Sequence, residues 1–172
     1  MIEEIAEIIN THSYVVDEWL LNRLDEEFAK GSYSNRENVD ALALELTAKR
    51  EGKMKVGEIA TNPKTGEKED YQWRHDWKYD ENILIDLKRK PMVHPNVCLT
   101  GVSKMIESYS IKELTHIVAF SQNIENNYKI GQKLYFKFEG MLPLKQAIKE
   151  STSMDTFKLL NVNNLQKPKP GV

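Results

Sequence analysis

The stretch of sequence that decides the fold is YQWRHDWKYDENILIDLKRK, residues 71–90. Its apolar side chains lie at odd positions in both halves, at Tyr71, Trp73, Trp77 and Tyr79 and then at Ile83, Ile85 and Leu87. This alternation predicts two strands, each with one apolar face. Only residues 80–82 separate them, so we expect an antiparallel hairpin.

The register of this hairpin follows from two constraints that agree. Matching the two apolar faces requires a three-residue loop, Asp80–Asn82, whose last residue takes the left-handed conformation that such loops need. Tyr79 then pairs with Ile83, and the same count places Asp76 opposite Asp86.

Two carboxylates that face each other repel, so they need a shared proton or a cation between them. A divalent metal is a natural cation, because Mg²⁺ binds one or two carboxylates together with waters and phosphate oxygens. Lys88 lies on the same face as Asp86 and diagonal to Asp76. Two acids and a lysine around one metal can orient a water and neutralise charge on a phosphate. The alternative is a solvent-exposed charged face in which Lys78 and Lys88 pair with the aspartates.

Elements on both sides of the hairpin complete the predicted fold, which is α+β (mixed α/β) with a central mixed β-sheet, a three-stranded meander and flanking helices. The N-terminal residues 1–28 have helical spacing. The expected elements after them are a helix at 36–50, strands at 53–61, 69–79 and 83–90, a helix at 100–109, strands at 115–122 and 133–142, and a helix at 144–151.

The length of 172 residues predicts a single domain. We divide it into four parts: an N-terminal helical arm over 1–33, a core over 34–123, a C-terminal strand and helix over 124–165, and a tail over 166–172.

The net charge of -2 excludes binding of nucleic acid by bulk positive charge. The charge is uneven, because residues 1–27 hold eight acids and one base, Arg23. This acidic segment is either a solvated helix face, a restraint on a basic site, or a docking surface for a protein partner or a second copy of the chain.

Cys98 is the only cysteine, which excludes an intrachain disulfide and a cysteine-based zinc cluster. The first residues are acidic, unlike a signal peptide, and no apolar run is long enough to cross a membrane. We therefore expect a cytoplasmic protein that does not act in a membrane.

The order of elements and the acids on the hairpin resemble the PD-(D/E)XK, or restriction-endonuclease-like, nuclease superfamily over about half of the chain. That family carries an acid on the second strand and an acid-x-lysine on the third, matched here by Asp76 and by Asp86-Leu87-Lys88. The resemblance implies that Glu45, in the middle of the preceding helix, completes the metal site. Two features depart from the family pattern: His75 replaces the usual proline, and residue 86 is an aspartate.

The resemblance implies a divalent-metal-dependent nuclease that hydrolyses DNA phosphodiester bonds, from a phage or from a restriction or repair system. Asp76, Asp86 and Glu45 would bind Mg²⁺ or Mn²⁺, and Lys88 would position the attacking water. The residues implied as contacts to double- or single-stranded DNA are Arg74, Arg89, Lys90 and Lys104, with ordinary surface charge as the alternative for the last three.

Two other functions remain open from the sequence. One is a catalytically inactive, nuclease-like module that binds nucleic acid. The other is a protein-interaction module that presents the acidic N-terminal helices to a partner and mimics nucleic acid.

Overall fold

A computed structural model describes residues 1–29, 36–55, 76–99, 115–154 and 158–169. Its elements, in chain order, are α1 (Ile2–Thr11), β1 (Ser13–Val15), α2 (Glu18–Ala29), α3 (Arg36–Arg50), β2 (Trp77–Asp80), β3 (Ile83–Arg89), β4 (Asn96–Leu99), β5 (Thr115–Gln122), β6 (Lys133–Pro143), α5 (Leu144–Glu150), β7 (Thr152–Ser153), β8 (Lys158–Asn161) and the 3-10 helix η3 (Val162–Asn164). None of the described helices combines the length and the apolar character that crossing a membrane requires.

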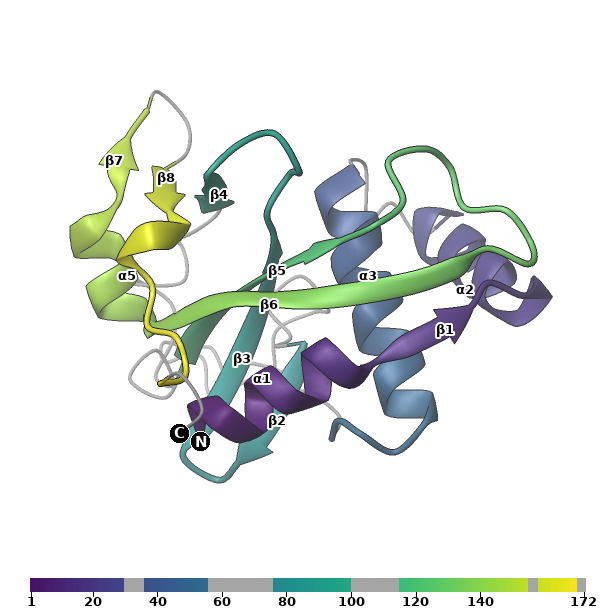
Figure 1. The fold of residues 1–172 in the computed structure, drawn as a ribbon, viewed down its shortest axis with the longest axis horizontal. Helices are drawn as coiled ribbons and strands as arrows, with labels where there is room; N and C mark the ends of the chain where they lie inside the picture. The colour runs from purple at the N-terminus through teal and green to yellow at the C-terminus, as the bar shows by residue number, and fades with distance from the viewer. Residues whose placement is uncertain (30–35, 56–75, 100–114, 155–157, 170–172) are drawn as a thin grey trace, which may run out of the picture.

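The described strands form two sheets, which confirms the predicted α+β class. The larger is a five-stranded mixed sheet of order β1-β6-β5-β3-β2, and the smaller is a three-stranded sheet of order β4-β8-β7. Figure 1 shows the smaller sheet and α5 at one end of the long strand β6, with α2 and α3 toward its other end. Within the larger sheet β3 pairs in parallel with β5, and β5 pairs antiparallel with β6.

The hairpin of β2 and β3 has the predicted register. Trp77 pairs with Ile85 and Lys78 with Leu84, as the count predicts. The pairing of the described residues ends at Trp77, and the Asp76 N–H donates to the Ile85 carbonyl, so the predicted pairing of Asp76 with Asp86 is not part of the observed ladder. The predicted faces are also present, because Trp77, Ile85 and Leu87 are buried in one hydrophobic core. The alternation of apolar and polar residues was therefore sufficient to predict how the two strands align.

The turn of this hairpin differs from the prediction. A bulge after Lys78 makes Asp80, rather than Tyr79, the partner of Ile83. The Asp80 carboxylate accepts a hydrogen bond of 2.7 Å from the Asn82 N–H and so stabilises the shorter turn. In the described ranges no residue other than glycine has a positive φ, so the expected left-handed loop residue was wrong.

The two faces of the large sheet pack against different elements. Phe120, Phe136 and Phe138 lie in the core that includes α1, α2 and α3. Ile117 and Leu142 lie in a second core with α5, β4 and β8. The alternation in β6 changes at a bulge between these regions, where Ala119 and Phe120 of β5 pair with Gly140 and Phe138. Gly140 has a φ of 139°, and a side chain there would collide with Leu165.

The N-terminal segment is not the helical arm that the sequence predicted. The strand β1 separates α1 from α2 and pairs with β6, with Ser13 opposite Tyr135. Asp17 caps α2 by accepting a hydrogen bond of 3.0 Å from the Leu20 N–H. Because Ile5 and Ile9 are fully buried, α1 is part of the main core.

Other predictions from the sequence have mixed outcomes. The helix at 36–50 and the strand at 115–122 are confirmed with the predicted bounds, and the predicted tail is tied to β6 through two backbone hydrogen bonds of 3.0 Å between Gln166 and Met141. Lys55 forms an antiparallel bridge to Lys78 where the first meander strand was expected. Residues 56–61, residues 69–75 and the predicted helix at 100–109 lie outside the described ranges.

Candidate active site

Asp76 stands immediately before β2 and is held by the backbone of β3. Its N–H donates a hydrogen bond of 3.1 Å to the Ile85 carbonyl, and its Oδ2 accepts one of 2.8 Å from the Leu87 N–H. The Asp76 carboxylate therefore accepts a hydrogen bond from β3 in place of a backbone carbonyl of the neighbouring strand. This arrangement fixes Asp76 against the strand that carries Asp86 and Lys88.

The charge of Asp76 is influenced by each of the other three predicted catalytic residues. Packing around its carboxyl raises the pKa of Asp76 well above its usual value, and the charges of Glu45 and Asp86 raise it further. The Leu87 N–H and the Lys88 ammonium act in the opposite direction. Such effects weaken with distance, so Glu45 of α3 and both Asp86 and Lys88 of β3 lie near enough to Asp76 to influence its charge.

Asp86 and Lys88 occupy the face of β3 opposite to Ile85, Leu87 and Arg89. Both are partly exposed, whereas their strand neighbours Ile85 and Leu87 are buried. In the parallel pairing with β5, Asp86 lies beside Ile117 and Lys88 beside Ala119. The two polar side chains are thus positioned by a strand whose other face is anchored in the core.

Glu45 is a buried carboxylate on α3. Its residue surface is 0% exposed, and its Oε1 lies 2.6 Å from the Nζ of Lys49 one helical turn later. A buried charge requires such a partner, because desolvation costs several kcal/mol per ion. Lys49 was not singled out from the sequence, although its spacing of four residues from an acid was a usable signal.

A second buried polar cluster holds α3 against the sheet and was also missed. Asp40 is fully buried, and its Oδ2 lies 2.9 Å from the Nε of Arg89. The Gln122 side-chain amide donates a hydrogen bond of 3.0 Å to the same carboxylate, and the Tyr128 hydroxyl donates another. These contacts join α3 to β3, to β5 and to the segment before β6.

The position of Arg89 corrects its predicted role as a phosphate contact. Arg89 is 8% exposed and is ion-paired with Asp40, so its guanidinium is used inside the protein. The sequence indicates that Arg89 is buried, because residue 89 lies on the same face of the strand as the apolar Ile85 and Leu87. An arginine on the apolar face of a strand needs a buried acid, and Asp40 supplies it.

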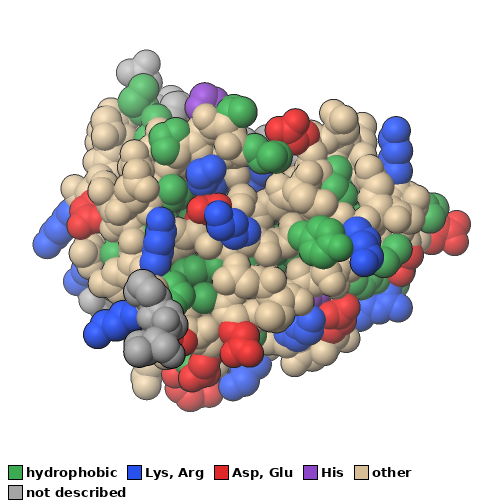
Figure 2. All heavy atoms as spheres, in the orientation of Figure 1, with side chains coloured by type: hydrophobic (Ala, Val, Ile, Leu, Met, Phe, Trp, Pro, Cys, Tyr) green, Lys and Arg blue, Asp and Glu red, His purple; other side chains and the backbone are tan. Residues whose placement is uncertain are grey.

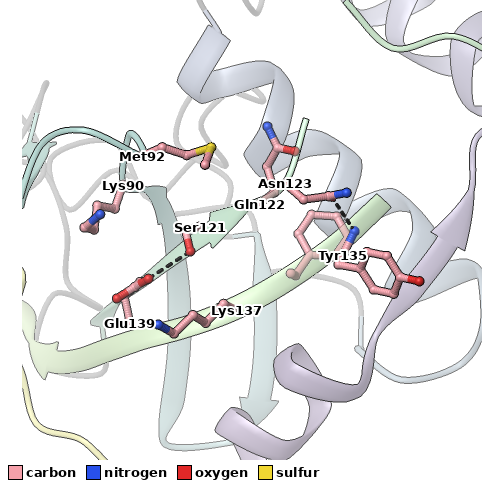
Figure 3. Close-up of a pocket in the computed structure, with 9 residues that line it drawn as sticks. Lys90, Met92, Ser121, Gln122, Asn123, Tyr135, Lys137 and Glu139 are labelled. Atoms are coloured by element: carbon pink, nitrogen blue, oxygen red, sulfur yellow. Dashed lines mark hydrogen bonds between the residues drawn. The ribbon is translucent and has the colours of Figure 1, made fainter. Parts of the chain in front are cut away.

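The remaining predicted contacts are divided between described and undescribed residues. Lys90 follows β3 and lines an open pocket of about 350 Å³ together with residues of β5 and β6 (Figure 3). Arg74 and Lys104 lie outside the described ranges. On the face shown in Figure 2, basic and acidic side chains are interspersed, as the small net charge leads one to expect.

The fit of a metal to these residues rests on their chemistry. Within the described ranges no three acidic, histidine or cysteine side chains converge as a preformed metal centre. Burial, and then repulsion by the charges of Glu45 and Asp86, nevertheless raises the pKa of Asp76. A divalent cation relieves that repulsion, and carboxylate oxygens are the ligands that Mg²⁺ prefers. The three residues therefore supply ligands of the type that Mg²⁺ or Mn²⁺ binds.

Comparisons of this chain with protein-family models, with curated proteins and with solved structures found no match.

Proposed function

We propose that this protein is a divalent-metal-dependent nuclease that hydrolyses DNA phosphodiester bonds. The observation that supports this proposal is that Glu45 of α3 and both Asp86 and Lys88 of β3 influence the charge of Asp76. Carboxylates beside a lysine are suited to phosphoryl chemistry, because the acids hold a cation and the lysine binds an anionic oxygen.

Each side chain has a distinct part in this proposal. Asp76 and Asp86 would hold Mg²⁺ or Mn²⁺, with Glu45 as a third carboxylate, and the bound metal would supply charge neutralisation and a more acidic water. The Leu87 N–H, 2.8 Å from Asp76 Oδ2, keeps that carboxylate oriented. Lys88 carries a positive charge on the same face and would hold a phosphate oxygen or the attacking water.

A second candidate is a catalytically inactive, nuclease-like module that binds nucleic acid. The observation that favours it is the ion pair of 2.6 Å between Lys49 Nζ and Glu45 Oε1, because the ammonium already neutralises a carboxylate that the metal would need as a ligand. In this case the acids near Asp76 are balanced by lysines alone. The two candidates differ in whether the protein binds a divalent metal.

Cleavage of DNA tests the proposal. Purified protein is incubated with plasmid and with single-stranded DNA in Mg²⁺, in Mn²⁺ and in EDTA. We expect cleavage that requires metal and that falls by about 100-fold or more in Asp86→Asn. The matched control is Asp80→Asn, which changes the same residue type in the same hairpin at its turn and should leave cleavage unchanged.

Thermal unfolding with and without Mn²⁺ gives a readout that is independent of activity. A ligand that binds the folded state raises its melting temperature, so we expect a rise for the unsubstituted protein and little rise for Asp86→Asn. Cleavage that survives both EDTA and Asp86→Asn would overturn the proposed site. The absence of both cleavage and Mn²⁺ stabilisation would favour the inactive binding module.

A further inference from the structure

One face of β6 carries a polar row that the candidate active site does not use. Lys133, Tyr135 and Lys137 alternate with the buried Leu134 and Phe136. The three exposed side chains therefore share the face of β6 that points away from the core of α1, α2 and α3. We call this row, together with Lys90, the β6 face.

Tyr135 is an exposed aromatic residue on a rigid stretch of backbone. It is 47% exposed, and its N–H donates a hydrogen bond of 2.7 Å to the side chain of Asn123. The Asn123 amide in turn donates one of 2.9 Å to the Lys133 carbonyl. Asn123 thus continues the pairing of β5 with β6 and fixes the backbone of β6 at Tyr135. Lys133 Nζ lies 5.9 Å from the ring centroid.

The pocket beside Tyr135 connects β6 to the end of β3. Lys90 and Lys137 both line it, as does Met92, which is 52% exposed. Figure 3 shows Lys90, Lys137 and Glu139 grouped around Ser121 at one end, with Tyr135 at the other. Among the described lining residues Glu139 is the only acid, and its carboxylate accepts a hydrogen bond of 2.8 Å from the Ser121 hydroxyl.

The β6 face is continuous with the candidate active site. Lys90 follows Lys88 by two residues, and its N–H donates a hydrogen bond of 2.6 Å to the Phe120 carbonyl, so the β3–β5 ladder extends to this point. Since side chains two residues apart on a strand share a face, the charges of Asp86, Lys88 and Lys90 form one line. That line leads from Asp86 to Lys90, which lines the pocket.

We propose that the β6 face binds single-stranded DNA and directs it toward the grouped carboxyls, an inference that rests on the proposed nuclease function. Lysines hold backbone phosphates, and an exposed aromatic ring stacks on a base. The lysines and the tyrosine alternate here along one strand, as such a ligand requires. We commit to a single strand because the bases of a duplex are already stacked on one another and cannot lie on Tyr135.

Fluorescence anisotropy with labelled oligo(dT), in EDTA, measures binding without cleavage. We expect Tyr135→Ala to weaken binding by about tenfold and Tyr135→Phe to leave it nearly unchanged, because the phenyl ring also stacks. Lys137→Ala should reduce the salt dependence of binding by about 0.7 in the log–log slope. Lys149→Ala, which removes the same charge from an exposed position on α5, is the matched control and should bind as the unsubstituted protein does.

Three results would overturn this inference: no binding of oligo(dT), equal binding by Tyr135→Ala, or tighter binding of a duplex of the same length. Measuring DNA cleavage by the same variants distinguishes a wrong DNA-binding surface from a wrong nuclease assignment. Metal-dependent cleavage that Tyr135→Ala and Lys137→Ala do not alter would retain the nuclease and reject the β6 face. Tyr135-dependent binding without any metal-dependent cleavage would retain the β6 face and reject the nuclease.

Discussion

At the scale of single residues, His12 shows how one buried side chain joins the end of α1 to α3. Its Nε2 lies 2.7 Å from Thr47 Oγ1, and that hydroxyl donates its proton to the Ala43 carbonyl at 2.7 Å. Nε2 must therefore carry the imidazole proton, which leaves Nδ1 as an acceptor for Lys53 Nζ at 3.3 Å. Glu51 Oε2 also lies 3.3 Å from Nδ1, so it is the burial of the ring that favours the neutral imidazole.

The stability of the protein should consequently fall in acid through His12. Burial lowers the pKa of His12 to about 4. The negative charge of Glu51 acts in the opposite direction, and the positive charge of Lys53 lowers the pKa further. The unfolded chain takes up a proton near pH 6.5, so stability present above that pH is lost as the pH falls toward 4.

This loss can be measured by urea unfolding of the unsubstituted protein and of His12→Gln at pH 7 and pH 4. We expect the stability advantage of the histidine to shrink by about 3 kcal/mol between the two pH values. An advantage that is constant with pH would show that His12 titrates equally in the folded and unfolded states.

At the scale of elements, the position of α3 relative to β3 depends on the buried pair of Asp40 and Arg89. This pair determines where Glu45 lies, because α3 carries both acids. The register of β2 and β3 arises from parity within the hairpin, but no pattern in α3 specifies which strand it contacts. The candidate site therefore depends on the local pairing of β2 with β3 and on the long-range contact of α3 with β3.

Removal of one partner of this pair should be costly. Asp40→Asn leaves Arg89 buried beside a neutral group, and we expect the free energy of unfolding to fall by about 3–5 kcal/mol. Metal-dependent cleavage should also fall, because Glu45 is displaced. Urea unfolding gives the stability, and Arg23→Met, which breaks an exposed pair on α2, should cost less than about 1 kcal/mol.

A double-mutant cycle tests the coupling within this pair. Asp40→Asn combined with Arg89→Met removes both charges, so the double variant should be more stable than the sum of the single changes predicts. Additive effects would show that the ion pair is not the contact that holds α3.

At the scale of the whole molecule, the N-terminal segment belongs to the core although it carries many acids. The Tyr79 hydroxyl donates a hydrogen bond to Glu4, which joins α1 to the hairpin. Asn10 accepts one of 2.8 Å from the Phe138 N–H of β6. The acids thus lie on the outer side of a helix whose inner side is anchored, and the segment is not a separable arm.

Shortening a buried side chain of α1 should therefore destabilise the entire fold. Ile9 is fully buried and Ile130 is 65% exposed. We expect Ile9→Ala to lower the free energy of unfolding by about 2–5 kcal/mol and Ile130→Ala by less than about 0.5 kcal/mol. Urea unfolding followed by tryptophan fluorescence measures both, and equal effects would place α1 outside the cooperative unit.

The features that the sequence predicted correctly are those that local periodicity specifies. The bounds of the helix at 36–50, those of the strand at 115–122 and the register of β2 with β3 all follow from the spacing of apolar residues. The proximity of Asp76, Asp86 and Lys88 follows from the same parity, whereas Glu45 was identified only through the resemblance.

Other features depended on partners that the folded chain brings from far along the sequence. The strand β1 exists because β6 pairs with it, and β4 pairs with β8, which lies about sixty residues later. Arg89 is a buried ion-pair partner rather than a phosphate contact because α3 places Asp40 against it. The spacing of residues determines which side of an element a residue occupies, but only the packing of elements determines what that residue meets.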